Sequence, residues 1–164
     1  MSKRVLILMR HGKSAYPEGV DDHERPLAER GQREAALGGD WIRASQPEVD
    51  LVLCSTATRT RETLAATRIE APVTYEPSIY GGSPHELVNL LRAVTTSAET
   101  VLMIGHAPGI PWTAWELAAN RDSIAAADMS QKYPTSAIAV LEFDREWHEL
   151  DPGTGELIRF LVPR

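Results

Sequence analysis

Short apolar runs alternate along the chain with longer segments in which apolar residues recur every three or four positions. The runs have the length and continuity of strands buried on both faces of a sheet, and they cover residues 3–9, 51–54, 73–75, 100–104 and 137–143. Helical spacing marks residues 32–45, 56–67 and 84–94, and the stretch that holds Trp112, Trp115 and Leu117. Strands that alternate with helices predict a mostly parallel sheet covered by helices on both faces.

Local signals sharpen two of the helices. Before residues 84–94, Ser83 can act as the N-cap, Pro84 suits the first helical position and Glu86 completes a capping box. Residues 32–45 carry an apolar stripe of Leu37, Trp41 and Ala44. The Gly38-Gly39 pair inside it costs about 1 kcal/mol per glycine and predicts an irregular centre.

The C-terminal segment has the signature of a hairpin. A turn-rich stretch, residues 151–155, separates residues 147–149 from the apolar residues 157–161, and we expect these two segments to pair. The predicted fold class is therefore α/β: a single three-layer α/β/α domain, residues 1–164, with a mostly parallel sheet and a C-terminal antiparallel hairpin.

Composition narrows the class of protein. The 164 residues suit one domain, and no repeat or linker divides them. A net charge of −6, from 17 Lys and Arg against 23 Asp and Glu, disfavours nucleic acid as a partner. No apolar run is long enough for a membrane span, the first residues do not form a secretory signal, and the single Cys54 excludes an internal disulfide framework. We expect a cytoplasmic protein without a membrane partner.

Polar groups follow three of the predicted strands directly. Residues 3–9 run into Arg10-His11-Gly12, residues 51–54 precede Ser55 and Arg59, and residues 100–104 run into Gly105-His106. In open α/β sheets, ligands bind beyond the carboxyl ends of the strands. We therefore expect two histidines and two arginines to converge at one edge of the sheet.

Such a cluster suits phosphoryl transfer. Arg10 and Arg59 can clamp a phosphoryl group through their planar guanidinium groups. A neutral imidazole is a competent nucleophile, and a second, protonated histidine can stabilise charge on the phosphoryl oxygens. Gly12 and Gly105 have no side chain, so we expect the backbone to approach the anion closely there.

These motifs, in this order, resemble the histidine phosphatase superfamily, and within it the small SixA-type phosphohistidine phosphatases. Arg25-Pro26-Leu27-x-x-x-Gly31 and residues 135–139 are similar to local signatures of that group. The resemblance implies a phosphatase that hydrolyses phosphohistidine through a phosphorylated His11, with Arg10, Arg59 and His106 completing the phosphate pocket. It also implies substrate contacts from Gly12 and Arg25, no metal or other cofactor, and a phosphorylated protein or small phosphorylated molecule as the partner.

The sequence departs from the superfamily at one chemically important place. Many members have a carboxylate general acid after the third strand, but residues 79–82 read Ile-Tyr-Gly-Gly. Glu76 and Glu86 flank this stretch, and either is a candidate acid. Without a proton donor, the enzyme should favour leaving groups that need none, such as the imidazole of phosphohistidine.

Several alternatives stay open. The enzyme could act on a small-molecule phosphomonoester, or the chain could bind phosphate without turnover; a mutase fits less well because the chain is short. Arg59 could be a solvated helix charge, and Arg25 could pair with nearby carboxylates. A cysteine phosphatase is excluded because position 60, six residues after Cys54, is Thr rather than Arg. A metal site is disfavoured because no ligand pair has helical i, i+4 spacing and two arginines would repel the cation.

Overall fold

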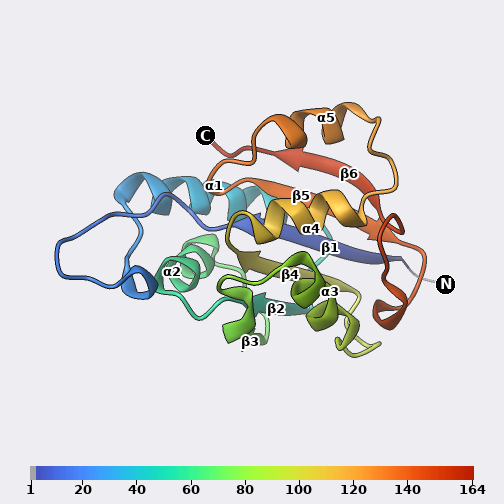
Figure 1. Cartoon of the computed structure of the whole chain (residues 1–164), viewed down its shortest axis with the longest axis horizontal. Coiled ribbons are helices and arrows are strands. Elements are labelled where there is room, and N and C mark those ends of the chain that lie inside the picture. The colour runs from blue at the N-terminus through green and yellow to red at the C-terminus, as the bar shows by residue number, and fades with distance from the viewer. Residues whose placement is uncertain (1–2) are drawn as a thin grey trace.

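The computed structural model describes residues 3–164. Six strands form one sheet in the spatial order β3-β2-β4-β1-β5-β6 (Figure 1). The strands are β1 (Arg4–Arg10), β2 (Leu51–Cys54), β3 (Val73–Tyr75), β4 (Thr100–Gly105), β5 (Ile138–Phe143) and β6 (Glu156–Leu161). The four strands β3, β2, β4 and β1 run parallel, β5 is antiparallel to β1, and β6 is antiparallel to β5. The predicted α/β class with a mostly parallel sheet is confirmed.

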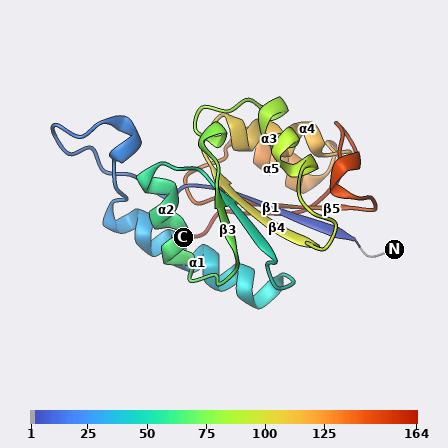
Figure 2. The same ribbon diagram turned by 90° about the horizontal axis from the view of Figure 1, so that it is seen from below.

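Five α-helices cover the two faces of the sheet. Figure 2 shows α1 and α2 on one face and α3, α4 and α5 on the other. The helices are α1 (Glu29–Ser45), α2 (Thr58–Thr67), α3 (Pro84–Arg92), α4 (Gly109–Leu117) and α5 (Ile124–Gln131). Each face has its own hydrophobic core, because successive side chains of the central strands point to opposite faces: Leu6 and Leu8 belong to one core, Ile7 and Met9 to the other. Within residues 3–164, no helix combines the length and apolarity of a membrane span.

The C-terminal antiparallel pair exists, but its first strand is not the predicted one. Residues 147–149 form a short 3₁₀-helix, η3 (Trp147–Glu149), and β6 pairs instead with β5. Trp147 is completely buried, and its indole Nε1 donates a hydrogen bond of 2.6 Å to the carbonyl of Ala98. The free energy gained by burying this large side chain in the core that holds Leu6 and Leu8 outweighs what it would gain by pairing as a strand residue.

The structure also corrects the prediction for α1. The helix is continuous through Gly38-Gly39, and Gly39 is buried where α1 crosses α2. A Cβ at position 39 would collide with the backbone of Thr67, so the glycine allows close helix packing. The predicted stripe was wrong in part: Leu37 is exposed, whereas Ala35 and Ile42 face the core.

Helix α3 was predicted in detail, whereas helix α5 was not predicted. In α3, Ser83 Oγ accepts from the Glu86 N–H and the Glu86 carboxylate accepts from the Ser83 N–H, so the predicted capping box is confirmed. Helix α5 escaped prediction. Its N-cap, Ser123, accepts a hydrogen bond from Ala126, but Ile124 at its first position is almost fully exposed and the helix has little apolar periodicity.

Candidate active site

The carboxyl ends of β1 and β4 bring two histidines together. His11 follows the last residue of β1, and His106 follows the last residue of β4. Because these strands are neighbours in the sheet, the two imidazole rings lie 5.2 Å apart, centroid to centroid. Both histidines are buried. This distance is short enough for both rings to contact one phosphate group.

Local hydrogen bonding orients the His11 ring. Its Nδ1 lies 2.7 Å from the carbonyl oxygen of Gly12. A carbonyl can only accept, so Nδ1 carries the proton and Nε2 keeps its lone pair. The pKa of His11 is lowered to about 4, chiefly by burial; the bond to Gly12 opposes this shift, and the nearby charges of Arg59 and Arg10 add to it. His11 is therefore neutral at neutral pH, with an unprotonated Nε2.

Two arginines enclose the space around the histidines. Arg10 donates from Nη1 to the carbonyl of Tyr133 at 2.8 Å. Arg59 is 6% exposed and donates from Nη1 to the carbonyl of Asp22 at 2.6 Å. The Nε atoms of both arginines are buried and have no hydrogen-bond partner among the described residues. Buried donors without a partner are costly, and a bound anion would satisfy them.

His106 has one occupied and one unoccupied ring nitrogen. Its Nε2 lies 2.8 Å from the hydroxyl of Ser55, and its Nδ1 is buried without a partner among the described residues. Burial, followed by the charges of His11 and Arg59, lowers the pKa of His106 to about 3. In the free pocket this histidine is a neutral group rather than the imidazolium considered from the sequence.

Gly12 and Gly105 lie where other parts of the chain leave no room for a side chain. The Gly12 N–H already donates to Thr63 Oγ1 at 2.9 Å, and a Cβ at position 12 would lie 2.7 Å from the carbonyl oxygen of Gly31. A Cβ at position 105 would lie 2.8 Å from a methyl group of Ile79. Close packing therefore accounts for both glycines, and an approach of their backbone to an anion stays a prediction. Gly12 acts on the site by holding His11 Nδ1.

Asp22, which the sequence did not single out, joins three parts of the site. Its carboxylate accepts from Tyr80 Oη at 2.5 Å, from Arg59 Nη2 at 3.1 Å and from Arg25 Nε at 3.1 Å. These bonds, that of Tyr80 first, hold the pKa of Asp22 well below its usual range, so the carboxyl is ionised. In the sequence it is one of three adjacent carboxylates with His23, and nothing local distinguishes it from Asp21 or Glu24.

Arg25 lies beside the pocket, but its guanidinium donates hydrogen bonds to residues of its own loop. Besides Asp22, it donates from Nη1 to Ser14 Oγ at 2.6 Å, and its guanidinium stacks 4.0 Å above the ring centroid of Tyr16. The structure thus places it in the carboxylate pairing that the sequence left open. Its charge is still close enough to His11 to lower the pKa of that histidine.

The mouth of the site is a pocket of about 510 Å³, lined among others by Asp22, Arg59, Tyr80, His106 and Trp112. The Tyr80 ring packs edge-on against His106, with centroids 5.3 Å apart. Among the described residues, Asp22 is the only carboxylate that lines this pocket.

Neither candidate general acid is placed there. Glu86 is bound in the α3 capping box, and Glu76 lines a different pocket beside β2 and β3. Cys54 at the end of β2 is fully buried, and burial raises the pKa of its thiol to about 12, so it has no nucleophilic character. Residues 3–164 contain no cluster of three or more His, Cys, Asp or Glu arranged to hold a metal.

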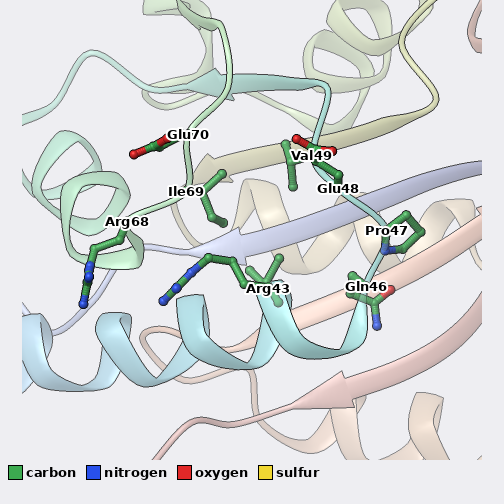
Figure 3. Close-up of a pocket in the computed structure, with 9 residues that line it drawn as sticks. Arg43, Gln46, Pro47, Glu48, Val49, Arg68, Ile69 and Glu70 are labelled. Atoms are coloured by element: carbon green, nitrogen blue, oxygen red, sulfur yellow. The ribbon is translucent and has the colours of Figure 1, made fainter.

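A second pocket, of about 350 Å³, lies at the other end of the sheet (Figure 3). Its lining comes from the C-terminal end of α1 and from the segments that lead into β2 and β3, and it includes Arg43, Glu48, Val49, Arg68 and Glu70. We call it the opposite pocket. It contains no histidine.

Known proteins are similar to this chain in sequence. The sequence profile of the histidine phosphatase superfamily (branch 1) matches residues 6–79. An uncharacterized protein of Mycobacterium tuberculosis is 48% identical over 158 residues, which span 95% of this chain and 100% of the relative.

Two solved structures are similar over nearly the whole chain. A SixA protein of Nakamurella multipartitia superposes with a TM-score of 0.92 at 42% identity, covering 99% of this chain and 98% of the other. The protein histidine phosphatase SixA complexed with tungstate superposes with a TM-score of 0.79 at 25% identity, covering 97% of each chain.

Proposed function

The chain belongs to the histidine phosphatase superfamily, as a member of its SixA type, and we propose that it hydrolyses the N–P bond of phosphohistidine through a phosphorylated His11. The observation that carries the proposal is the composition of the pocket. It combines a neutral nucleophile, unpartnered buried donors and, as its one lining carboxylate among the described residues, an ionised Asp22.

In the first step, the lone pair of His11 Nε2 attacks phosphorus. A new N–P bond forms while the bond between phosphorus and the substrate's imidazole breaks, and that imidazole leaves with the bonding electron pair. Arg10, Arg59 and His106 hold the phosphoryl oxygens. His11 Nδ1 keeps its proton throughout, and the carbonyl of Gly12 stabilises the positive charge that develops on the ring.

In the second step, water attacks the phosphorylated His11. The P–O bond forms, the N–P bond breaks, and inorganic phosphate leaves with the protons of the water. Tungstate is a tetrahedral oxyanion, and its presence in a SixA structure supports a pocket of this kind for an oxyanion of the same shape.

The preference for an N–P bond follows from the lack of an acid. Asp22 is ionised, so it has no proton to give. Its hydrogen bond raises the pKa of Tyr80, which makes the phenol a weak acid. An alkoxide leaving group needs a proton donor, whereas a substrate imidazole protonated on its second nitrogen leaves as a neutral molecule.

A substrate panel tests the proposal. Initial rates of phosphate release are compared for a phosphohistidine peptide, phosphoramidate, a phosphoserine peptide and a sugar phosphate, each with and without a chelator. We expect kcat/KM to be far higher for the first two and unchanged by the chelator. Equal kcat/KM for the phosphohistidine and phosphoserine peptides would contradict the proposal and favour a monoester phosphatase. No turnover of any substrate would favour a phosphate-binding protein.

A further inference from the structure

We infer that Ser55 is a positioning residue that fixes the tautomer of His106, so that this histidine presents an N–H on Nδ1 to the phosphoryl group. The inference rests on the proposed phosphate pocket. A neutral imidazole can donate a hydrogen bond to a phosphoryl oxygen only from the nitrogen that carries its proton.

The contacts of Ser55 determine which way its hydroxyl points. Ser55 is completely buried, and its Oγ has two neighbours: the backbone N–H of Ala57 at 3.3 Å and Nε2 of His106 at 2.8 Å. The Ala57 N–H can only donate, so it occupies a lone pair of the hydroxyl oxygen. The hydroxyl proton then has one acceptor within reach, the lone pair of His106 Nε2.

The opposite arrangement leaves two groups unsatisfied. If Nε2 carried the proton and donated to Ser55, the buried hydroxyl proton would have no acceptor among the described residues. His106 Nδ1 would then be a buried lone pair without a donor among the described residues. Both cost free energy, since buried polar groups without partners are penalised.

With Ser55 as the donor, the one group left without a partner is the Nδ1–H of His106, and a phosphate oxygen satisfies it. The pocket also explains why a tautomer matters here. Before an anion binds, burial lowers the pKa of His106 to about 3, so the ring meets the anion as a neutral group and only one of its nitrogens carries a proton to donate. Arg10 and Arg59 supply the positive charge, and Ser55 makes His106 a donor without adding another cation to a crowded site.

Nitrogen NMR tests the inference directly. In the wild-type protein at pH 7, with and without inorganic phosphate, long-range ¹H–¹⁵N correlations of His106 should show Nδ1 protonated and Nε2 unprotonated. In Ser55→Ala, the pattern should move toward protonated Nε2. A protonated Nε2 in the wild-type ring would overturn the inference whatever the enzyme's substrate, so this result is independent of phosphohistidine turnover.

Kinetics give a second readout. We expect kcat/KM of Ser55→Ala to fall by about 10–100-fold, the size of loss seen when the partner that orients a metal-binding histidine is removed. Ser55→Thr, which keeps a hydroxyl, should restore both the tautomer and part of the rate. Ser45→Ala removes an exposed hydroxyl at the end of α1 and is the matched control. An unchanged tautomer and rate in Ser55→Ala would overturn the inference. If that variant fails to fold, the wild-type spectrum still decides.

Discussion

The two ends of the sheet each carry a pocket lined by arginine, but they differ in how those arginines are held. At the amino ends of the strands, in the opposite pocket, Arg43 and Arg68 are exposed to solvent, and Arg43 donates to Asp40 at 2.6 Å. At the carboxyl ends, Arg59 is buried and its Nε has no partner among the described residues. Arg59 is shielded from water before any anion arrives, whereas Arg43 and Arg68 in the opposite pocket are not.

Water explains why this difference matters. An exposed guanidinium is already hydrated, so binding an anion exchanges one set of favourable contacts for another and gains little. A buried donor without a partner gains the full value of the new bond, and the low dielectric around it strengthens the attraction. A pocket lined by exposed arginines is therefore not by itself an anion-binding site. Five changes test this contrast.

The largest effect is expected at the nucleophile. His11→Ala should remove essentially all phosphatase activity, because it removes the Nε2 lone pair that we propose as the phosphoryl acceptor. His85→Ala, on the exposed side of α3, is the matched control and should keep full activity. Phosphate release and circular dichroism are measured together. When the reaction is quenched during turnover, the wild-type protein should carry acid-labile phosphate and the variant should carry none. Substantial turnover by folded His11→Ala would refute the assignment.

The second change compares arginines at the two ends. Arg59→Ala should lower kcat/KM by about 10²–10³-fold, the loss typical of one charge-stabilising donor, and should weaken competitive inhibition by phosphate and vanadate. Arg43→Ala, in the opposite pocket, should leave kcat/KM and both inhibition constants unchanged. If the two substitutions weakened inhibition equally, burial of an arginine would not be what makes a pocket bind these anions.

Acid should lower the free energy of unfolding of the protein, and the two buried histidines of the candidate active site should cause much of this loss. His11 and His106 have pKa values of about 4 and about 3 in the folded protein and an ordinary value of 6.5 when unfolded. Below pH 6.5 the unfolded chain binds more protons, so stability is lost as pH falls from 6.5 toward these folded values. Between pH 7 and 5 the two groups together should cost about 4 kcal/mol.

Urea denaturation at several pH values measures this loss. The double variant His11→Asn/His106→Asn should flatten the fall in the free energy of unfolding, whatever its stability at pH 7. His85→Asn should keep the wild-type slope. If the double variant keeps it too, the buried histidines are not the origin of the acid sensitivity.

A smaller effect is expected for the carboxylate that ties the site together. Asp22→Ala removes one acceptor each from Arg59, Arg25 and Tyr80, so the guanidinium of Arg59 should become mobile and kcat/KM should fall by about one order of magnitude. Glu24→Ala, two residues along the same loop, is the matched control. If Asp22 acted as a general acid, the substitution would instead remove the limb of the pH–rate profile in which activity on phosphoserine substrates falls as that acid loses its proton with rising pH; we do not expect this.

The smallest effect is expected at the opposite pocket itself. Arg68 caps the end of α2 with φ of +58°, in the left-handed region that favours glycine. Arg68→Gly should therefore leave activity unchanged and alter the free energy of unfolding by less than about 1 kcal/mol, in the stabilising direction. A loss of activity would show that the opposite pocket communicates with the site.

Much of the architecture was predictable because it is local. Continuous apolar runs identified the five strands β1–β5, although their ends shifted by a residue or two, and Ser83, Pro84 and Glu86 identified α3 from interactions within one helical turn. The motifs after β1, β2 and β4 converge because parallel neighbouring strands end at the same edge, so topology alone brings His11, Arg59 and His106 together. In these places the sequence by itself determined the outcome.

Only the tertiary structure decided the details that depend on partners far apart in the chain. Asp22 meets Arg59 and Tyr80, which lie 37 and 58 positions away, and Ser55 meets His106 across 51 positions. The pairing of β6 with β5, rather than with the segment around Trp147, likewise depended on which large side chain the core could bury. Hydrogen-bond direction and burial are properties of the assembled packing, and residue spacing does not encode them.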